Sequence, residues 1–377
     1  MRHVRIAKKR RSLQRLSSPW KRGWEDGYKQ GWLRSYHLGQ CQSIVTQSQQ
    51  VLFGKWNIKV LFVQAQGTPY SSLDQGIYES LRGLVTEVVL VSEGVSVVSL
   101  ADETRPDLVL VLDALGTRFS AAQADEVRGL GIRTAIWLPD DPYHTDGSVH
   151  LVAHFDYVFT MEVSCVQLYR DIGCSQVHYL PSGVNLNCIG PGYVDDSYKH
   201  DICFIGSAFW NRVALFDQIA PYLSQKKVKI IGFWWERLEN YSLLASKIQG
   251  TWITPAEAAK YYNGAKVVIN LHRSIDDPTH NSNSRNLPAL SVNPRLFEIS
   301  ACGTLQLTDE REELSKFYTP GVEIACFHSA DELIQQLDYY LTHEQARRDI
   351  ALSGLHRTGH EHTFTHRLTD LLQTIFG

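Results

Sequence analysis

The sequence predicts an α/β protein with two Rossmann-like, doubly wound domains that face each other across a cleft. Its 377 residues exceed the ~250–300 residues at which a single core stops growing, so two domains are expected. Short Val/Ile/Leu-rich runs alternate with helical patterns, which is typical of parallel sheets covered by helices on both faces. A stretch rich in Gly, Pro, Asp and Asn, residues 182–200, separates two such series and is interpreted as the linker.

A basic, helical extension, residues 1–50, is expected before the first domain. Its first part carries seven basic side chains: Arg2, Arg5, Lys8, Lys9, Arg10, Arg11 and Arg15. A solvated tail is the simplest interpretation, and a tether to nucleic acid or to a surface is the alternative. Aromatic residues then recur with a helical period, at Trp20, Trp24, Tyr28 and Trp32, beside glycines 23, 27 and 31. We expect this stripe to pack on the first domain, with self-association or partner binding as the alternative.

The first domain is predicted over residues 51–190 and the second over residues 191–360. Six apolar runs are the predicted strands of the first domain: 58–63, 86–91, 108–112, 134–138, 157–160 and 177–180. Five runs are the predicted strands of the second: 202–205, 228–231, 267–271, 304–307 and 324–327. Helical patterns lie between them, for example at 73–84 and 121–130, and a last amphipathic helix spans about 361–375. Ligands of such sheets bind beyond the carboxyl ends of the strands.

Composition excludes several classes of protein. A net charge of -3 argues against general nucleic-acid binding, which calls for a broad basic surface. The seven cysteines have no metal-binding spacing, and an odd number cannot all pair, so a reduced, cytoplasmic compartment is expected. No apolar run reaches the ~18 residues of a membrane span, and no signal peptide is predicted.

The segment 293–304 carries the clearest chemical signal. Asn293 suits a helix N-cap and the next residue, a proline, suits the first helical position. A helix start attracts phosphate, and Arg295 there would bind it in a bidentate manner. Glu298 lies on the same face and would accept hydrogen bonds from a ribose diol. Gly303 then forms a tight turn, and the segment predicts a seat for a nucleotide diphosphate, with an ordinary amphipathic helix as the alternative.

Other loops of the second domain extend this predicted donor site. Gly206 and Ser207 follow a strand and would bring backbone N–H groups to a phosphate that Arg212 also reaches. His272 and Arg273 end a later strand and lead into a long polar loop, 274–293, which we expect to cover the nucleotide. Aromatic residues 233–235 would flank a base or pack in the core. His272 would contact the diphosphate or the sugar, or would only be packed.

Two loops of the first domain are the predicted acceptor side. Gly67 and Thr68 lie in a small-residue turn after the first strand, which is not a phosphate-binding motif and would contact substrate through its backbone. Asp140 and Asp141 follow the fourth strand, with Tyr143 close behind. One carboxylate would face the cleft as a general base, unless both only cap a helix. A metal site would need further oxygen ligands, so none is predicted.

These motifs, taken in order, resemble the CgeB-like (spore-maturation) glycosyltransferases. The segments that carry the resemblance are 137–142, 178–181, 204–207, 269–273, 293–309 and 361–367, and it covers residues 59–377. It implies the GT-B fold, a nucleotide-sugar donor on the second domain, an acceptor on the first, and a last helix, 361–377, that crosses back to the first domain. One departure concerns Leu290, where related retaining enzymes have a glutamate, so the stereochemistry stays open.

The predicted function is metal-independent transfer of a sugar, a hexose in the simplest case, from a nucleotide-diphosphate sugar to a hydroxyl acceptor. UDP-sugars are favoured, no cofactor is expected, and the acceptor is a glycan, protein, nucleobase or small molecule. Catalytic roles are assigned to Asp140, Asp141 and Arg295. The alternatives are a non-catalytic spore-coat or phage-associated binding protein with the same fold, or a sugar-nucleotide epimerase.

Overall fold

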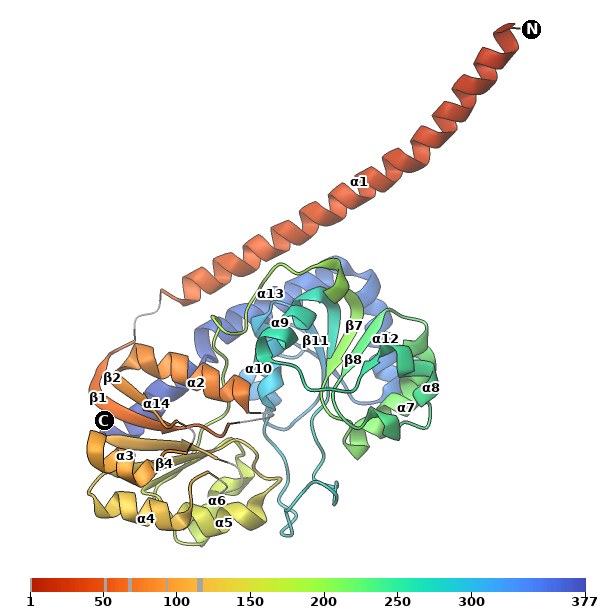
Figure 1. Cartoon of the computed structure of the whole chain (residues 1–377). Helices are drawn as coiled ribbons and strands as arrows, with labels where there is room; N and C mark the ends of the chain where they lie inside the picture. The colour runs from red at the N-terminus through yellow and green to blue at the C-terminus, as the bar shows by residue number, and fades with distance from the viewer. Residues whose placement is uncertain (1, 51–52, 67–69, 93, 114–117) are drawn as a thin grey trace.

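The computed structural model describes residues 2–50, 53–66, 70–92, 94–113 and 118–377, and it contains two parallel sheets of six strands each (Figure 1). The strand order of the first is β2-β1-β3-β4-β5-β6 and that of the second is β12-β11-β10-β7-β8-β9. Both orders reverse direction next to the first strand, as in doubly wound folds. The predicted fold class is therefore confirmed, while the boundaries at residues 50, 190 and 360 stay predictions.

The first sheet lies between two layers of helices. Its strands are β1 (Trp56–Val63), β2 (Val85–Leu90), β3 (Leu108–Leu112), β4 (Arg133–Leu138), β5 (Tyr157–Thr160) and β6 (Val177–Tyr179). The helices that follow these strands are α2 (Ser71–Leu84), α3 (Val97–Thr104), α4 (Ala121–Gly129), α5 (Thr145–Leu151) and α6 (Ser164–Asp171). Every residue of β3 is buried, because helices α3 to α6 cover one face and α2 covers the other.

The second sheet has the same layered plan. Its strands are β7 (His200–Ile205), β8 (Val228–Ile231), β9 (Ile248–Gln249), β10 (Ala265–Asn270), β11 (Leu305–Asp309) and β12 (Ala325–Phe327). Its helices are α7 (Trp210–Ser224), α8 (Tyr241–Leu244), α9 (Pro255–Gly264), α10 (Pro294–Ala301), α11 (Leu314–Phe317), α12 (Ala330–Thr342) and α13 (Glu344–Glu361). The helices α7 and α12 cover one face, and α9, α10 and α11 cover the other.

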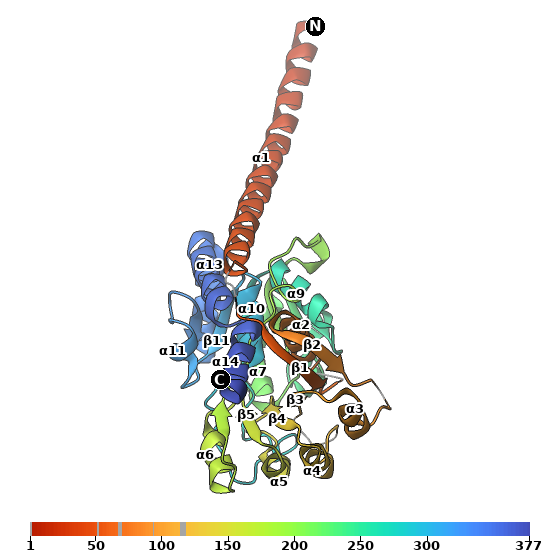
Figure 2. The same cartoon turned by 90° about the vertical axis from the view of Figure 1, so that its left-hand side faces the viewer.

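The last helix, α14 (Phe364–Phe376), leaves the second sheet and packs beside α2 on the first (Figure 2). It begins at 364 rather than 361, because α13 runs to Glu361 and Thr363 then accepts a hydrogen bond from the His366 amide as an N-cap. Its buried leucines belong to the same cluster as the core of β1, β3 and β4.

The N-terminal helix α1 (Arg2–Ser48) projects from the body of the molecule (Figure 1). The last turns of α1 pack against α13 and the end of α10. Cys41 is buried there, His37 Nε2 lies 2.9 Å from the Gly303 carbonyl oxygen, and Arg348 of α13 donates to the Leu33 carbonyl at 2.6 Å. The expectation that the aromatic stripe packs on the first domain is wrong. The stripe lies on the turns that precede this contact, and its rings are exposed.

Candidate active site at the domain interface

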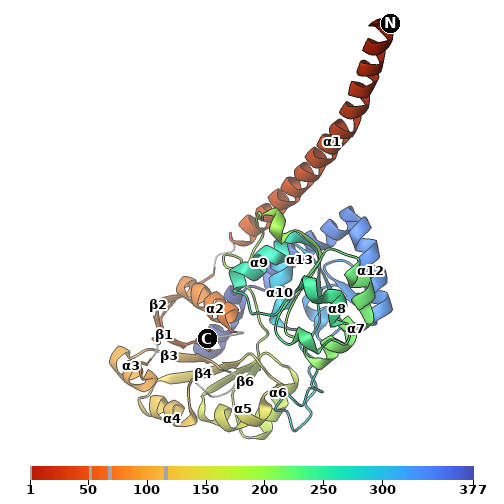
Figure 3. The same ribbon diagram turned by 45° about the vertical axis from the view of Figure 1, so that its right-hand side comes forward.

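The loops after the strands of the two sheets face each other between the domains (Figure 3). A direct contact joins them, since the Tyr143 hydroxyl, from the first domain, donates to the backbone carbonyl of Arg273 at 2.9 Å. The Arg273 guanidinium also lies over the Tyr143 ring, 4.5 Å from its centroid. Tyr143, predicted to bind the acceptor, therefore holds the two domains together at this point.

The start of α10 is fixed by a pair of asparagines. Asn293 accepts a hydrogen bond from the Leu296 amide at 3.1 Å, as the predicted N-cap does. Its side chain also exchanges hydrogen bonds with that of the buried Asn270, at 3.0 and 3.3 Å. Asn270 ends β10, so this exchange sets the first turn of α10 at the carboxyl edge of the sheet, where a ligand is expected.

Arg295 and Glu298 both lie on this first part of α10 and are partly exposed. Among the described residues, no hydrogen-bond or ion-pair partner is found for the Arg295 guanidinium. Burial raises the pKa of Glu298, while Arg295 and a hydrogen bond from Ser72 at the start of α2 lower it. Glu298 thus faces the first domain, and Arg295 has its donors free for an anion.

The loop after β7 packs closely on the end of β8. The Gly206 amide donates to the Ile231 carbonyl at 2.7 Å, and Gly232 adopts a φ of +145°. A side chain on Gly232 would meet the Gly206 carbonyl oxygen at 2.2 Å, so only glycine fits there. Ser207 follows directly, and its carbonyl accepts a hydrogen bond from Arg212 at 2.9 Å.

Arg212 has a different role from the predicted phosphate contact. Its side chain is 2% exposed, and its Nε and Nη2 donate to the Leu271 carbonyl at 3.0 and 2.8 Å. Burial lowers its pKa, and the nearby Arg295 lowers it further. The guanidinium donates to main-chain carbonyls, so Arg212 connects the loop after β7 to the end of β10. Its positive charge also lies near Arg295.

The buried His272 is paired with Asp309, which ends β11 and is partly exposed. The His272 Nδ1 and backbone N lie 2.6 and 2.9 Å from Asp309 Oδ1, while its buried Nε2 has no partner among the described residues. Burial lowers the pKa of His272, and Asp309 opposes this. A sequence scan could have found Asp309 from its place at a strand end. The sequence did not indicate it because the predicted strand ends at residue 307, whereas β11 continues to Asp309.

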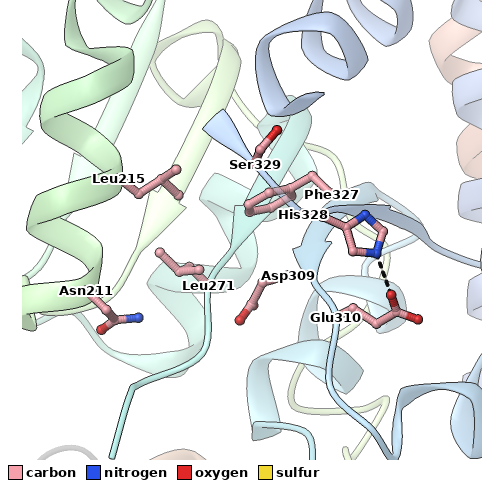
Figure 4. A pocket seen from close by; sticks show the side chains of 8 residues that line it. All are labelled: Asn211, Leu215, Leu271, Asp309, Glu310, Phe327, His328 and Ser329. Carbon is pink, nitrogen blue, oxygen red and sulfur yellow. Dashed lines mark hydrogen bonds and ion pairs between the residues drawn. The ribbon is translucent and has the colours of Figure 1, made fainter. Parts of the chain in front are cut away.

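A cavity of about 400 Å³ opens beside this pair, at the carboxyl edge of β10, β11 and β12 (Figure 4). Its lining includes Leu271, Asp309 and Phe327 from the strand ends and Asn211 from α7. The Asn211 amide donates to the His272 carbonyl at 2.8 Å, while its Oδ1 has no partner in the described part of the chain. The cavity belongs to the second domain and continues the strand-end region that contains His272.

Arg273 lies at the centre of the interface. Its guanidinium is stacked between the rings of Tyr143 and Phe209, with centroid distances of 4.5 and 4.4 Å, and it donates to the His280 carbonyl. Burial lowers its pKa, and Asp140, which is on the first domain, raises it. Arg273 therefore brings positive charge near the predicted acceptor base.

Asp140 is the carboxylate that faces the cleft. It accepts a hydrogen bond from the Tyr70 hydroxyl at 2.5 Å, and His144 Nε2 lies 3.8 Å from the same oxygen. Burial and then Asp140 raise the pKa of Tyr70, so this phenol is a donor at neutral pH. Burial lowers the pKa of His144, and Asp140 opposes this. Tyr70 and His144 flank the two predicted loops, but no local pattern in the sequence indicates that they meet at Asp140.

Asp141 points away from the cleft, which corrects its assignment as a catalytic candidate. It is 8% exposed and accepts hydrogen bonds from Thr160 at 2.7 Å and from Tyr169 at 2.7 and 2.8 Å. Burial raises its pKa to about 7. Asp140 and Asp141 lie in the turn after β4, where the Tyr143 amide donates to the Asp140 carbonyl at 2.9 Å, and within this turn the two carboxylates point in different directions.

The long loop 274–293 docks on the first domain (Figure 3). The carboxylate of Glu162, 2% exposed, accepts hydrogen bonds from the amides of Leu290 and Ser291 at 3.0 to 3.2 Å. Nearer the tip, Asp146 accepts from the Ser284 amide and hydroxyl, and Arg285 adds an ion pair at 3.4 Å. The loop thus forms a strap that joins both domains beside the site.

Aromatic residues after β8 divide between core and surface. Trp235 is fully buried and donates to the Gly206 carbonyl at 3.0 Å, whereas Phe233 is exposed. Trp234 stacks on His280 of the strap, with 4.1 Å between ring centroids. Arg237 lies over the Trp234 ring and donates to the Ala208 carbonyl in the loop after β7.

Three glycine or threonine residues that were predicted to contact substrate remain: Gly303 on the donor side, and Gly67 and Thr68 on the acceptor side. Gly303 lies at the far end of α10, with a φ of +65°, where Cys41 of α1 leaves no room for a side chain. Most of the length of α10 separates it from the Arg295 end, so its assignment to the donor site is wrong and its role is a helix-ending turn. Gly67 and Thr68 fall outside the described residues.

These residues define a site with a cationic and an acidic side. The second domain supplies Arg295, Arg273 and the N-terminus of α10, and the first domain supplies Asp140 with Tyr70 and His144. Such an arrangement can hold a diphosphate on one side and a hydroxyl group on the other, close to a carboxylate.

Comparison with known proteins agrees with this geometry. A family described as glycosyl transferase-like matches residues 212–373. The spore protein CgeB of Bacillus subtilis is 28% identical over 318 residues, which cover 81% of this chain and 95% of CgeB. HepE of Anabaena, solved in complex with UDP and glucose, superposes with a TM-score of 0.57 at 12% identity, over 85% of this chain and 99% of HepE. Sucrose-phosphate synthase of Thermosynechococcus elongatus superposes with a TM-score of 0.54 at 12% identity, over 84% and 99% of the two chains.

These matches confirm three predictions. The resemblance to the CgeB-like proteins holds over most of the chain, and the fold is that of the GT-B enzymes. The match to the glycosyl transferase-like family over most of the second domain agrees with the predicted glycosyltransferase activity. Across the described residues, every helix is too short or too polar to span a bilayer.

Proposed function

We propose that this chain, a glycosyltransferase with the GT-B fold, transfers a hexosyl group from a UDP-sugar to a hydroxyl acceptor. The nucleotide-sugar activity follows from the glycosyltransferase-like domain, and the preference for UDP is supported by the similar fold of HepE, which was solved with UDP and glucose bound. The observation that carries the proposal is the Arg295 guanidinium, whose donors are free at the capped start of α10. Glu298, on the same helix, can accept hydrogen bonds from the ribose hydroxyls of the donor.

The donor binds along α10 in this proposal. Arg295 and the helix N-terminus hold the diphosphate, and Glu298 accepts hydrogen bonds from the ribose hydroxyls. Ser207 lines the other side of the diphosphate with its backbone amide, whereas the predicted contact from Gly206 is not available because the Gly206 amide donates to the Ile231 carbonyl. His272 presents its free Nε2 toward the donor from the pair with Asp309.

The transfer step breaks the bond between the anomeric carbon and the phosphate oxygen and forms a bond from that carbon to the acceptor oxygen. Negative charge grows on the leaving diphosphate, and Arg295, Arg273 and the α10 dipole stabilise it. Asp140 orients or deprotonates the acceptor hydroxyl, with Tyr70 holding its carboxylate in place. The proton leaves the acceptor oxygen, and UDP leaves with the electron pair of the broken bond.

No cofactor or metal ion enters this proposal, because guanidinium groups and backbone amides supply the positive charge. The acceptor is a hydroxyl-bearing molecule that enters beside Tyr143. We place the reaction in the cytoplasm, a location supported by the seven free cysteines, since a reducing compartment keeps thiols unpaired. A surface for self-association on α1 is argued separately below.

Calorimetric titration with a panel of UDP-, GDP- and TDP-sugars tests the proposal. We expect a UDP-sugar to bind, Glu298→Ala to weaken its binding about tenfold or more, and Asp140→Asn to abolish transfer while binding remains. UDP-sugar binding that Glu298→Ala leaves unchanged, or transfer that Asp140→Asn leaves unchanged, would contradict the site. Turnover of a donor into its epimer without UDP release would instead indicate an epimerase, and binding without any turnover would indicate a non-catalytic relative.

A further inference from the structure

The exposed part of α1 carries two parallel rows of side chains that the active site does not use. The aromatic row consists of Trp20, Trp24, Tyr28, Trp32 and Tyr36, whose exposed fractions are 54 to 73%. The small row runs one position before it and consists of Gly23, Gly27, Gly31, Ser35 and Gly39. Trp24 stacks on Tyr28, and Trp32 on Tyr36, with centroid distances of 5.5 and 5.3 Å.

Neither row is explained by the folding of one copy. Each glycine costs ~1 kcal/mol relative to alanine in an exposed helix interior. No described atom comes within 4 Å of the place where a Cβ would stand on Gly23, Gly27 or Gly31, so nothing in the described part of this chain requires glycine there. Exposed indole and phenol rings likewise gain nothing from a position in water.

We propose that α1 crosses α1 of a second copy, and that the aromatic row of each helix lies in the small row of the other. Rows with a spacing of four form the ridges and grooves of a helix, and their interlocking gives a crossing angle of roughly -50°. A two-fold symmetric pair needs the same patch on both subunits. Each α1 supplies one ridge and one adjacent groove, which is the self-complementary arrangement that such a pair requires.

Charge selects the direction of the crossing. Residues 2–34 contain eleven Lys or Arg and two Asp or Glu, a charge of +9, whereas residues 35–48 contain none. Since the whole chain carries -3, the remainder carries -12. Antiparallel helices that cross near Tyr28 separate the two basic arms and direct each arm toward the acidic body of the other copy. A parallel pair would bring the arms together.

The contact is large enough for a stable pair. Aromatic side chains contribute roughly 150–250 Å² each when fully buried, and the rings of this row keep about half or more of that area exposed. Ten such rings, five from each copy, would bury on the order of 1,000 Å², which is the lower limit for a specific interface.

Sedimentation equilibrium of the full-length protein tests the pairing. We expect a mass of twice 42.8 kDa at concentrations of about 10 μM and above. Gly27→Leu fills the groove, and Trp24→Ala with Trp32→Ala removes the ridge, so each change should weaken dimerisation at least tenfold. Both should leave the helix intact, because leucine and alanine are better helix formers than the residues they replace. Asp26→Ala, on the opposite face of α1, is the matched control and should not change the mass.

Salt tests the direction of the pair. In the antiparallel arrangement, raising the ionic strength from about 0.05 to 0.5 M should weaken the dimer, because opposite charges approach each other. Strengthening by salt would contradict it. A monomeric wild-type chain, or a dimer that the groove and ridge variants leave unchanged, would overturn the proposal. So would a monomer that binds phosphatidylserine vesicles or duplex DNA through the same aromatic row.

Discussion

Three arginines of the second domain show that the role of a guanidinium depends on its partners. Arg212 gives its donors to main-chain carbonyls, and Arg273 is stacked between two rings while it donates to a carbonyl of the strap. Arg295 has no such partner among the described residues. All three follow strands of one sheet, yet only Arg295 combines partial exposure with free donors at a helix N-terminus.

Arg295→Ala tests this distinction. We expect it to lower kcat by about 10²–10³-fold, because one group that stabilises the leaving diphosphate is lost. Arg295→Lys should restore part of the rate as a point charge, but not the bidentate contact. Steady-state release of UDP measures both. Arg82→Ala, an exposed arginine on α2, is the control, and equal kinetics for Arg295→Ala and this control would contradict the assignment.

The raised pKa of Asp141 leads us to expect that the free energy of unfolding depends on pH. Its folded-state pKa is about 7, above the ordinary value of 3.8, so between these values the folded state binds more protons than the unfolded state. Stability therefore falls as pH rises from about 4 to about 7, by a few kcal/mol at most. Asn resembles the protonated carboxyl, so Asp141→Asn should gain stability relative to the wild type over the same range. Urea unfolding at pH 5, 6, 7 and 8 measures the difference, and a constant difference would contradict the prediction.

Some residue roles could be predicted from sequence and others could not. Asn293 was predicted as an N-cap because that role depends on residues within one turn. The division between Asp140 and Asp141 could not be predicted, because it depends on Thr160 and Tyr169 of neighbouring elements. Gly303 was misplaced for the same reason, since its constraint comes from a residue on α1.

At the scale of elements, apolar runs predicted eleven of the twelve strands found in the described residues. Only β9 was missed, because a two-residue edge strand has no periodic pattern. The sequence predicts that the strap 274–293 covers the nucleotide. Its contacts with Glu162 and Asp146 could not be predicted, because these residues are more than 100 positions away in the sequence. Hydrogen bonds from backbone amides to a distant carboxylate leave no mark on local sequence.

Glu162→Ala should release the strap. The amides of Leu290 and Ser291 would lose their acceptor, and the segment around the exposed Arg285 would open. Trypsin should then cleave after Arg285 several times faster than in the wild type, as mass spectrometry of the fragments would show. Asp171→Ala, an exposed carboxylate on α6, is the control. Cleavage at the wild-type rate in Glu162→Ala would mean that the strap is held by other contacts.

At the scale of the whole molecule, the last helix of the chain lies in the first domain. After the second sheet is complete, α14 returns and packs beside α2, with the Phe364 ring over Gly76, where a Cβ would stand 2.6 Å from the ring. The first core therefore includes residues from the last part of the sequence. Neither domain can be cut from the chain at a single point between the sheets without removing part of the other.

This arrangement makes a last prediction. Leu371 of α14 is fully buried in the core of the first domain, so Leu371→Ala should destabilise that domain by about 2–5 kcal/mol. Hydrogen exchange should rise along β1, β3 and β4 and remain low along β10 and β11. Leu337→Ala, an equally buried leucine of α12 in the second core, is the matched control and should give the reverse pattern. If Leu371→Ala raised exchange only in the second sheet, α14 would belong to the domain that precedes it in sequence, and the packing described for it would be wrong.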